Sequence, residues 1–125
     1  MKVINTKNAP QAIGPYVQAI KIENGTLYTS GQLGLNPETM KLPETIEEQT
    51  RNIFSNIDAI LAEAGYTKND VIKTLVLLDD LNNFSKCNEI YAEYFDKNKP
   101  ARSAFQVAAL PMNAKIEIEF IAFKK

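Results

Sequence analysis

The most regular feature of the chain is a run of apolar residues at helical spacing between positions 45 and 65. Thr45 stands three residues before Glu48, which is the spacing of a capping box, and Gly65 follows the last apolar residue as a helix terminator would. Acidic and polar residues fill most of the remaining positions. We therefore predict an amphipathic helix with one apolar stripe, formed by Ile46, Ile53, Ile57, Ile60, Leu61 and Ala64.

A second helix is expected from about Asn82 to Lys97, before Asn98-Lys99-Pro100 stops it. Its apolar stripe would consist of Phe84, Cys87, Tyr91, Tyr94 and Phe95. Val71–Leu78, between the two helices, reads VIKTLVLL and is rich in apolar and β-branched residues. This composition and its short length predict a central strand.

Six segments in all read as β-strands, and Asn24-Gly25 between the second and third is the strongest short signal for a hairpin. A hairpin of the last two strands would place residues 102 and 117 on one sheet, because a turn-like connector, Leu110 to Asn113, joins them. The predicted strands are Lys2–Asn5, Val17–Glu23, Leu27–Gly31, Val71–Leu78, Ser103–Ala109 and Lys115–Phe123.

The resulting order, β-β-β-α-β-α-β-β, predicts an α+β domain with two helices on one face of a sheet. The length of 125 residues fits one domain, spanning 1–125. In the last strand, Ile121 and Phe123 add apolar groups to the face that carries Glu117 and Glu119. Because large exposed apolar faces are uncommon on monomers, we predict an oligomer with sites between subunits.

The composition excludes several classes of function. There is no histidine and one cysteine, Cys87, which removes Ser-His and Cys-His catalytic pairs, His-based metal sites and multi-cysteine metal sites. Fourteen basic and fifteen acidic residues give a net charge of -1, so nucleic acid is not an expected partner. Apolar runs of four residues predict no membrane segment, and the N-terminus lacks a secretory h-region. We expect a cytoplasmic protein.

Few residues remain that could carry chemistry. Arg102 follows a proline-bearing loop, where its guanidinium could hold a carboxylate, although a surface ion pair is the commoner role for such an arginine. Glu117 could orient an attacking water, or with Glu119 it could only solubilise a strand face. Tyr16 could present its hydroxyl to a site or pack beside its own Gly-Pro turn, and Asn88 could bind a ligand or cap a loop.

Three segments together identify a resemblance that covers nearly the whole chain. They are AIGPYVQAI at 12 to 20, TSGQLGLNPET at 29 to 39, and PARSAFQVAALPMNAKIEIEFIA at 100 to 122. These segments resemble the Rid (YjgF) proteins, and specifically the RidA branch of reactive intermediate deaminases. The resemblance implies a chorismate-mutase-like fold of the bacillus type, with a six-stranded mixed sheet, assembled as a homotrimer around a central β-barrel.

The same resemblance implies an activity, the hydrolysis of short-lived 2-enamines and 2-imines to 2-keto acids and ammonia. One such substrate is 2-aminoacrylate, which pyridoxal-phosphate dehydratases make from serine. It implies ligand sites in the clefts between subunits, a role in metabolite damage control, and neither a metal nor an organic cofactor. The expected partners are the small 2-imino or 2-keto acid and two further copies of the chain, without nucleic acid or membrane.

The resemblance also assigns roles to particular residues. Arg102 aligns with the family arginine that holds the substrate carboxylate, and Glu117 aligns with the glutamate that positions the attacking water. Tyr16, Gly31 and Asn88 align with residues that line the same cleft. Three positions depart from the family pattern: Ala104, whose backbone N–H would still contact the substrate, Met40 in an exposed loop, and Met112 at the cleft rim.

Two other functions compete with the deaminase. The first is a non-catalytic small-molecule binding or regulatory protein that holds 2-keto acids in the same cleft, which the fold cannot distinguish from an enzyme. The second is RNA binding or cleavage. The slightly acidic composition and the lack of a basic stripe interleaved with aromatic residues disfavour it.

Overall fold

The predicted long helix forms α1 (Ile46–Ala64) in the computed structural model, which describes residues 1–125. The Thr45 hydroxyl accepts a hydrogen bond from the Glu48 backbone N–H at 3.1 Å, and Gly65 ends the helix with a φ of 85°. A left-handed residue at this position is what glycine accommodates most easily. The expected apolar stripe is buried, so both predicted ends and the predicted face of this helix are confirmed.

The second helix, α2 (Phe84–Tyr94), is shorter than predicted. A 3-10 turn, Leu81–Asn83, precedes it, because the Asp80 carboxylate accepts a hydrogen bond from the Asn82 backbone N–H and organises a separate turn there. At the other end Phe95 leaves the helical conformation with a φ of -92° and a ψ of 61°. Phe95 is nevertheless buried, so its side chain completes the apolar stripe from outside the helix.

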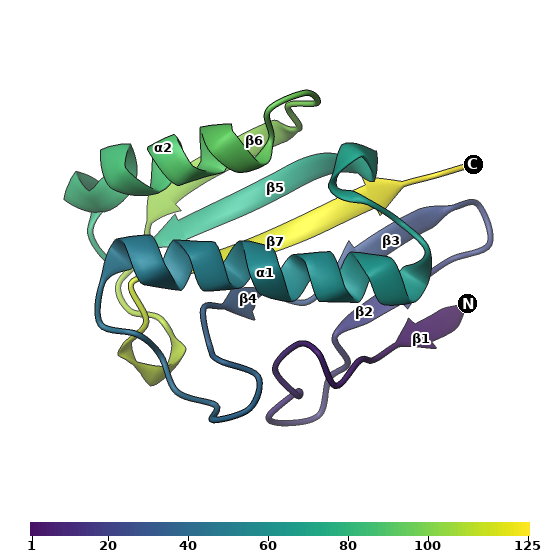
Figure 1. Cartoon of the computed structure of the whole chain (residues 1–125), viewed down its shortest axis with the longest axis horizontal. Helices are drawn as coiled ribbons and strands as arrows, with labels where there is room; N and C mark the ends of the chain where they lie inside the picture. Colours follow the sequence, from purple (N-terminus) through teal and green to yellow (C-terminus); the bar gives the residue numbers. More distant parts are fainter.

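The sheet has seven strands, one more than predicted, in the order β1-β2-β3-β7-β5-β6 with β4 beside β7 (Figure 1). All neighbouring strands are antiparallel except β5 and β6, which are parallel, so the sheet is mixed. The strands are β1 (Lys2–Ile4), β2 (Ala19–Lys21), β3 (Thr26–Thr29), β4 (Gln32–Leu33), β5 (Val71–Leu78), β6 (Ala101–Gln106) and β7 (Ile116–Phe123).

The additional strand arises from a bulge. Tyr28 of β3 pairs with Ile121, and Gln32 of β4 pairs with Ile118. The segment from β3 to β4 therefore advances four residues while β7 advances three. The Phe120 backbone N–H donates a hydrogen bond to the Thr29 hydroxyl at 3.0 Å, in place of a backbone carbonyl of the neighbouring strand. The extra residue lies in the Thr29 to Gly31 stretch, and it bends the strand where a predicted site residue stands.

The predicted hairpin of the last two strands is wrong. β5 lies between β6 and β7, and β6 runs parallel to β5, with Arg102 opposite Thr74. The reason is that α2 carries the chain back along the sheet between β5 and β6, which makes a β-α-β crossover rather than a hairpin. β5 is the central strand that the VIKTLVLL segment predicts.

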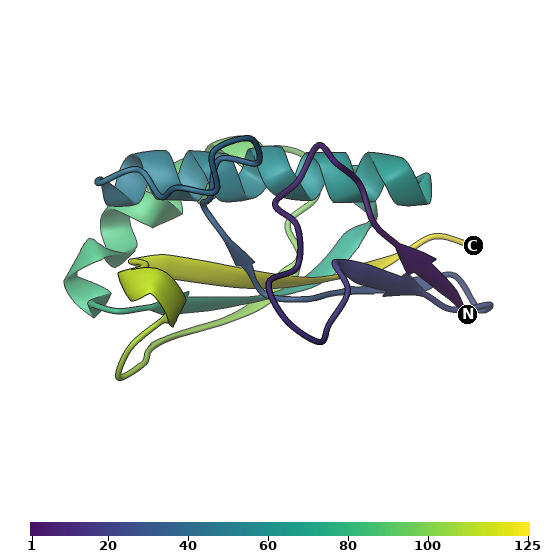
Figure 2. The ribbon, with the colours of Figure 1, turned by 90° about the horizontal axis from the view of Figure 1, so that it is seen from below.

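Both helices cover the same face of the sheet (Figure 2). That face carries fully buried core residues such as Ile116, Ile118 and Phe120. The opposite face, which we call the open face, has no helix on it and exposes apolar groups; it includes Tyr28, Leu75, Leu77, Phe105, Glu117, Glu119, Ile121 and Phe123. Neither helix combines the length and apolar composition needed to cross a membrane.

Candidate functional site

Arg102 lies in β6 at the edge of the sheet, beside α2. It pairs with the buried Thr74 of β5, and directly paired residues point to the same face, so its side chain lies on the helix-covered side. The guanidinium Nη1 donates a hydrogen bond to Asn88 Oδ1 at 2.7 Å. The only ion pairs in the chain are Met1 with Glu23 and Lys68 with Asp96. Arg102 therefore does not form the surface ion pair that its residue type favours.

A cavity of about 410 Å³ adjoins this arginine. It contains two cationic side chains and an amide, and no acidic residue lines it, so its charge favours an organic anion such as a carboxylate. The lining residues are Asn88, Tyr91, Ala92, Phe95, Lys99, Pro100 and Arg102.

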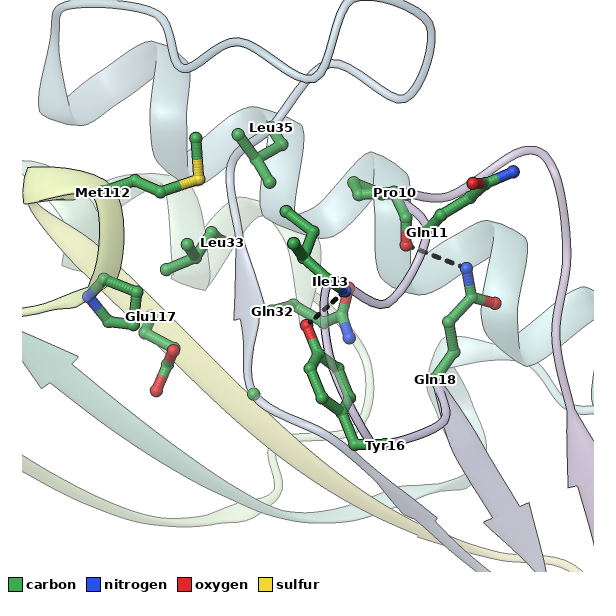
Figure 3. Close-up of a pocket in the computed structure, with 12 residues that line it drawn as sticks. Pro10, Gln11, Ile13, Tyr16, Gln18, Gln32, Leu33, Leu35, Met112 and Glu117 are labelled. Carbon is green, nitrogen blue, oxygen red and sulfur yellow. Dashed lines mark hydrogen bonds between the residues drawn. The ribbon is translucent and has the colours of Figure 1, made fainter.

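Glu117 lies in β7 on the open face, opposite Leu77 of β5 and Leu33 of β4. It borders a second cavity of about 300 Å³, whose wall is largely apolar apart from a few amide groups (Figure 3). The lining residues are Pro10, Gln11, Ile13, Tyr16, Gln18, Gly31, Gln32, Leu33, Leu35, Pro111, Met112 and Glu117.

The electrostatic environment of Glu117 suits a base. Burial, and secondarily the charge of Glu119, raise the pKa of the Glu117 carboxyl above its usual value. No hydrogen bond from the chain stabilises its charged form. A carboxylate that is partly desolvated and free of protein donors binds a proton more readily, and both of its oxygens remain available to a water molecule.

The bulge brings Gly31 against this carboxylate. A Cβ at position 31 would lie 2.8 Å from Glu117 Cδ and 2.9 Å from Oε2, so any larger residue there would require the Glu117 side chain to move. Gln18 supports the neighbouring loop, because its amide donates a hydrogen bond to the Pro10 carbonyl at 2.9 Å. Gly31 and Gln18 both line the Glu117 cavity.

Tyr16 packs beside its own Gly-Pro turn. Its hydroxyl accepts a hydrogen bond from the Ile13 backbone N–H at 3.3 Å, so the side chain packs against its own turn (Figure 3). The turn depends on Gly14, which has a φ of 140°. The Tyr16 ring is half exposed and also lines the Glu117 cavity.

The predicted site residues thus form two groups that do not meet within one chain. Arg102 and Asn88 lie beside α2, and Ala104, two residues further along β6, is half-buried on the same face. Tyr16, Gly31 and Glu117 gather at the other cavity. β5 separates the strands of Arg102 and Glu117, and their side chains lie on opposite faces of the sheet.

Sequence reasoning missed the aromatic residues around Arg102. The guanidinium carbon lies 4.7 Å from the centroid of the Tyr91 ring and 5.1 Å from that of Phe84. The signal was present in the spacing, because Phe84, Asn88 and Tyr91 are four and three residues apart and share one face of α2. The sequence pattern placed both rings only in the apolar stripe.

The positions that depart from the family pattern keep turn conformations. Met40 has a φ of 57° and its backbone N–H donates to the Asn36 carbonyl at 2.8 Å, so this turn forms without a glycine. Met112 has a φ of 58° and lines the Glu117 cavity. The thioether therefore forms part of the rim, as its sequence position suggests.

A sequence model of the endoribonuclease L-PSP family matches residues 6–124 of this chain. The chain belongs to this family, which includes the Rid proteins. Its fold and sequence are similar to RidA from an Antarctic Psychrobacter species, with a TM-score of 0.96 and 46% identity over 99% of this chain and 100% of that chain.

Two further relatives bear on the chemistry. The 2-iminobutanoate/2-iminopropanoate deaminase of Mus musculus is 49% identical over 97% of this chain and 90% of the mouse protein. The structure of Escherichia coli TdcF with bound serine has a TM-score of 0.96 and 41% identity, and each chain is covered completely. The resemblance found in the sequence motifs is confirmed, and the family includes proteins named as imine deaminases.

Proposed function

We propose that this protein hydrolyses 2-imino acids, the tautomers of 2-enamines, to 2-keto acids and ammonia. The observation that carries the proposal is the presence of two complementary groups, each bordering a cavity, in a chain whose family contains named deaminases. Arg102 is a cation without an acidic partner, and Glu117 is a partly desolvated carboxylate without a protein donor. A small molecule with a carboxylate and an electrophilic carbon would use both groups.

In the proposed reaction, Arg102 binds the substrate carboxylate while Asn88 holds the guanidinium by its Nη1. Glu117 takes a proton from water as the water oxygen attacks the carbon of the C=N bond, and it passes that proton to the nitrogen, giving a neutral carbinolamine. Glu117 then moves the carbinolamine hydroxyl proton to the nitrogen as the C–N bond breaks, so that the C=O bond forms and ammonia leaves. One imine and one water give one keto acid and one ammonia, without an oxidant or reductant.

We further propose that the two groups meet between subunits of a homotrimer. One chain holds Arg102 and Glu117 on opposite faces of its sheet, so another copy has to supply one of them. The open face supports this assembly, because Phe105 and Tyr28 are each 48% exposed there and would gain from burial. The central β-barrel implied by the family resemblance would be built from these faces.

The wall of the Glu117 cavity favours a short, uncharged side chain on the substrate. Leu33, Leu35 and Met112 line it, and no cationic side chain does. The serine bound to TdcF shows that a related protein accepts a small amino acid. An imine such as 2-iminopropanoate or 2-iminobutanoate would fit this space, with its carboxylate directed toward Arg102 of another copy.

A coupled assay tests the proposal. A serine dehydratase generates 2-aminoacrylate, and semicarbazide traps the imine that remains, so a deaminase reduces the trapped product. The wild type should suppress trapping, and Arg102→Ala should not. Arg51→Ala is the matched control, because Arg51 is the only other arginine and lies on α1 away from both cavities.

Wild type that behaves like buffer alone would contradict the enzyme proposal. Calorimetry with 2-ketobutyrate, set beside the coupled assay, separates the deaminase from the binding protein. Saturable binding without turnover would favour the binding or regulatory protein, in which the same Arg102 holds a keto acid. Turnover together with binding leaves the deaminase proposal standing.

A further inference from the structure

We infer that Tyr91 is a positioning residue, whose ring, fixed by the Thr74 hydroxyl, holds the Arg102 guanidinium in the direction of the substrate carboxylate. The inference rests on the proposed function, because it assigns Arg102 the role of binding an organic anion. Tyr91 itself does not touch the substrate in this scheme. It acts through the arginine.

Arg102 needs such a support because of where it lies. It is an exposed residue of β6, an edge strand, and a long arginine side chain there has many rotamers. Fixing a rotamer-rich side chain on binding costs affinity, so a guanidinium that is already held binds an anion more tightly. The hydrogen bond to Asn88 Oδ1 fixes Nη1 of Arg102. The contacts with the Tyr91 and Phe84 rings restrict the orientation of the guanidinium plane.

The Tyr91 ring is the firmer of the two aromatic contacts. Its centroid lies 4.7 Å from the guanidinium carbon, within cation–π distance, and the Tyr91 residue is buried. The ring also packs against Phe95 and Phe54, with centroid distances of 4.9 and 5.9 Å. Phe84 lies further from the guanidinium, at 5.1 Å, and is only half-buried at the start of α2.

A buried hydrogen bond fixes this ring from the sheet. The Tyr91 and Thr74 hydroxyl oxygens are 2.7 Å apart, and Thr74 is fully buried. Thr74 is also the residue directly opposite Arg102 in the β5–β6 register. Thr74 thus pairs with Arg102 through the backbone and fixes the Tyr91 ring through its side chain. The Tyr91 ring in turn contacts the Arg102 guanidinium, so each of the three residues interacts with the other two.

The choice of an aromatic partner has a chemical consequence. An acidic side chain would orient the guanidinium but would also neutralise it and compete with the substrate carboxylate. A ring restricts the guanidinium by its face and leaves the full positive charge available. This agrees with the absence of any acidic residue among those that line the Arg102 cavity.

The test compares Tyr91→Leu, which removes the ring, with Tyr91→Phe, which keeps it. The control is Tyr94→Leu on the same helix, because Tyr94 stacks on Phe54 at 4.2 Å and contacts Asp58, not Arg102. For each variant we would measure the Kd for 2-ketobutyrate by calorimetry, KM and kcat with 2-iminobutanoate, and thermal unfolding.

We expect Tyr91→Leu to raise Kd and KM roughly tenfold, with kcat within about twofold of wild type, because carboxylate binding is lost equally in ground and transition states. Tyr91→Phe keeps the ring but loses the hydrogen bond to Thr74, so its Kd should rise only roughly threefold, as in Thr74→Val. Tyr94→Leu should lower stability and leave Kd and KM unchanged. If Tyr91→Leu does not fold, Thr74→Val releases the ring with little change in shape and should raise Kd roughly threefold.

A Kd for Tyr91→Leu within twofold of wild type, or an equal rise in Tyr94→Leu, would overturn the inference. If Tyr91→Leu does not fold, an unchanged Kd in Thr74→Val would also overturn the inference. Failure of the proposed function gives a different result: wild type binds 2-ketobutyrate without turnover, and the Kd ratios still decide the role of Tyr91. Wild type that neither binds nor turns over would overturn both.

Discussion

Gly31 lies directly against the carboxylate of Glu117, so closely that a Cβ on residue 31 would approach Glu117 Cδ to 2.8 Å. Contacts this short between a Cβ and another carbon do not persist, so the Glu117 side chain would have to move. The position of the proposed base thus depends on a residue that has no side chain. This relationship follows from the bulge between β3 and β4.

Gly31→Ala should therefore reduce kcat/KM roughly 10- to 100-fold, because displacing a catalytic group by about an ångström has effects of this size. Gly65→Ala is the control. Gly65 has a φ of 85° and no atom within 4 Å of an added Cβ, so alanine there costs about 1 kcal/mol of stability through backbone strain alone. Full activity in Gly31→Ala, measured with 2-iminobutanoate, would show that the position of the Glu117 carboxylate does not depend on Gly31.

The pH dependence of activity should respond to Glu119. The Glu119 charge contributes to raising the pKa of Glu117, and Glu117 has to be deprotonated to accept a proton from water. Glu119→Gln should lower the pKa of Glu117, so that the acid limb of the kcat/KM profile moves to lower pH. Glu63→Gln on α1, outside both cavities, should leave the profile in place. An acid limb that does not move would show that another group controls it.

Glu117→Gln should abolish most of the activity and stabilise the fold at neutral pH. A folded-state pKa raised above the unfolded value means that the charged form costs stability above the folded pKa and costs nothing below the unfolded pKa. The Tm advantage of the variant should be largest near pH 7, shrink as the pH falls through the folded pKa, and vanish in more acidic solution. Thermal unfolding at several pH values checks this, and an advantage that grows on acidification would refute it.

Two inactive variants should complement each other if the site lies between subunits. Arg102→Ala and Glu117→Gln, denatured together in equal amounts and refolded, should regain about a quarter of the wild-type activity, since random assembly gives each interface an intact pair in about one case in four. Each variant refolded alone is the control. Mixed oligomers without activity would mean that both groups act from the same chain.

The open face should carry the assembly. Phe105→Asp places a charge at a position that is 48% exposed in the single chain and lies opposite Leu77 in β5. We expect this variant to sediment as a monomer and to lose activity, while its circular dichroism retains the helical signal. A wild type that is itself monomeric, or a Phe105→Asp variant that remains trimeric, would contradict the proposed interface.

Local patterns predicted the helices and the central strand well. Thr45 and Gly65 mark the ends of α1 because capping involves residues only a few positions apart. The β5 bounds, Val71–Leu78, were predicted without error, since a short apolar strand is recognisable from its own composition. The two-residue β4 was missed, because a strand of this length has no periodicity of its own.

The family and the identities of the candidate residues came from the sequence, whose motifs are continuous stretches of chain. Only the tertiary structure decided which strand lies beside which, and it placed β5 between β6 and β7 instead of forming the predicted hairpin. It also divided Arg102 and Glu117 between two faces of the sheet and placed the Tyr91 ring against the Arg102 guanidinium. Side-chain periodicity is a local property, whereas strand pairing, register and ring contacts depend on free energies between residues far apart in the chain.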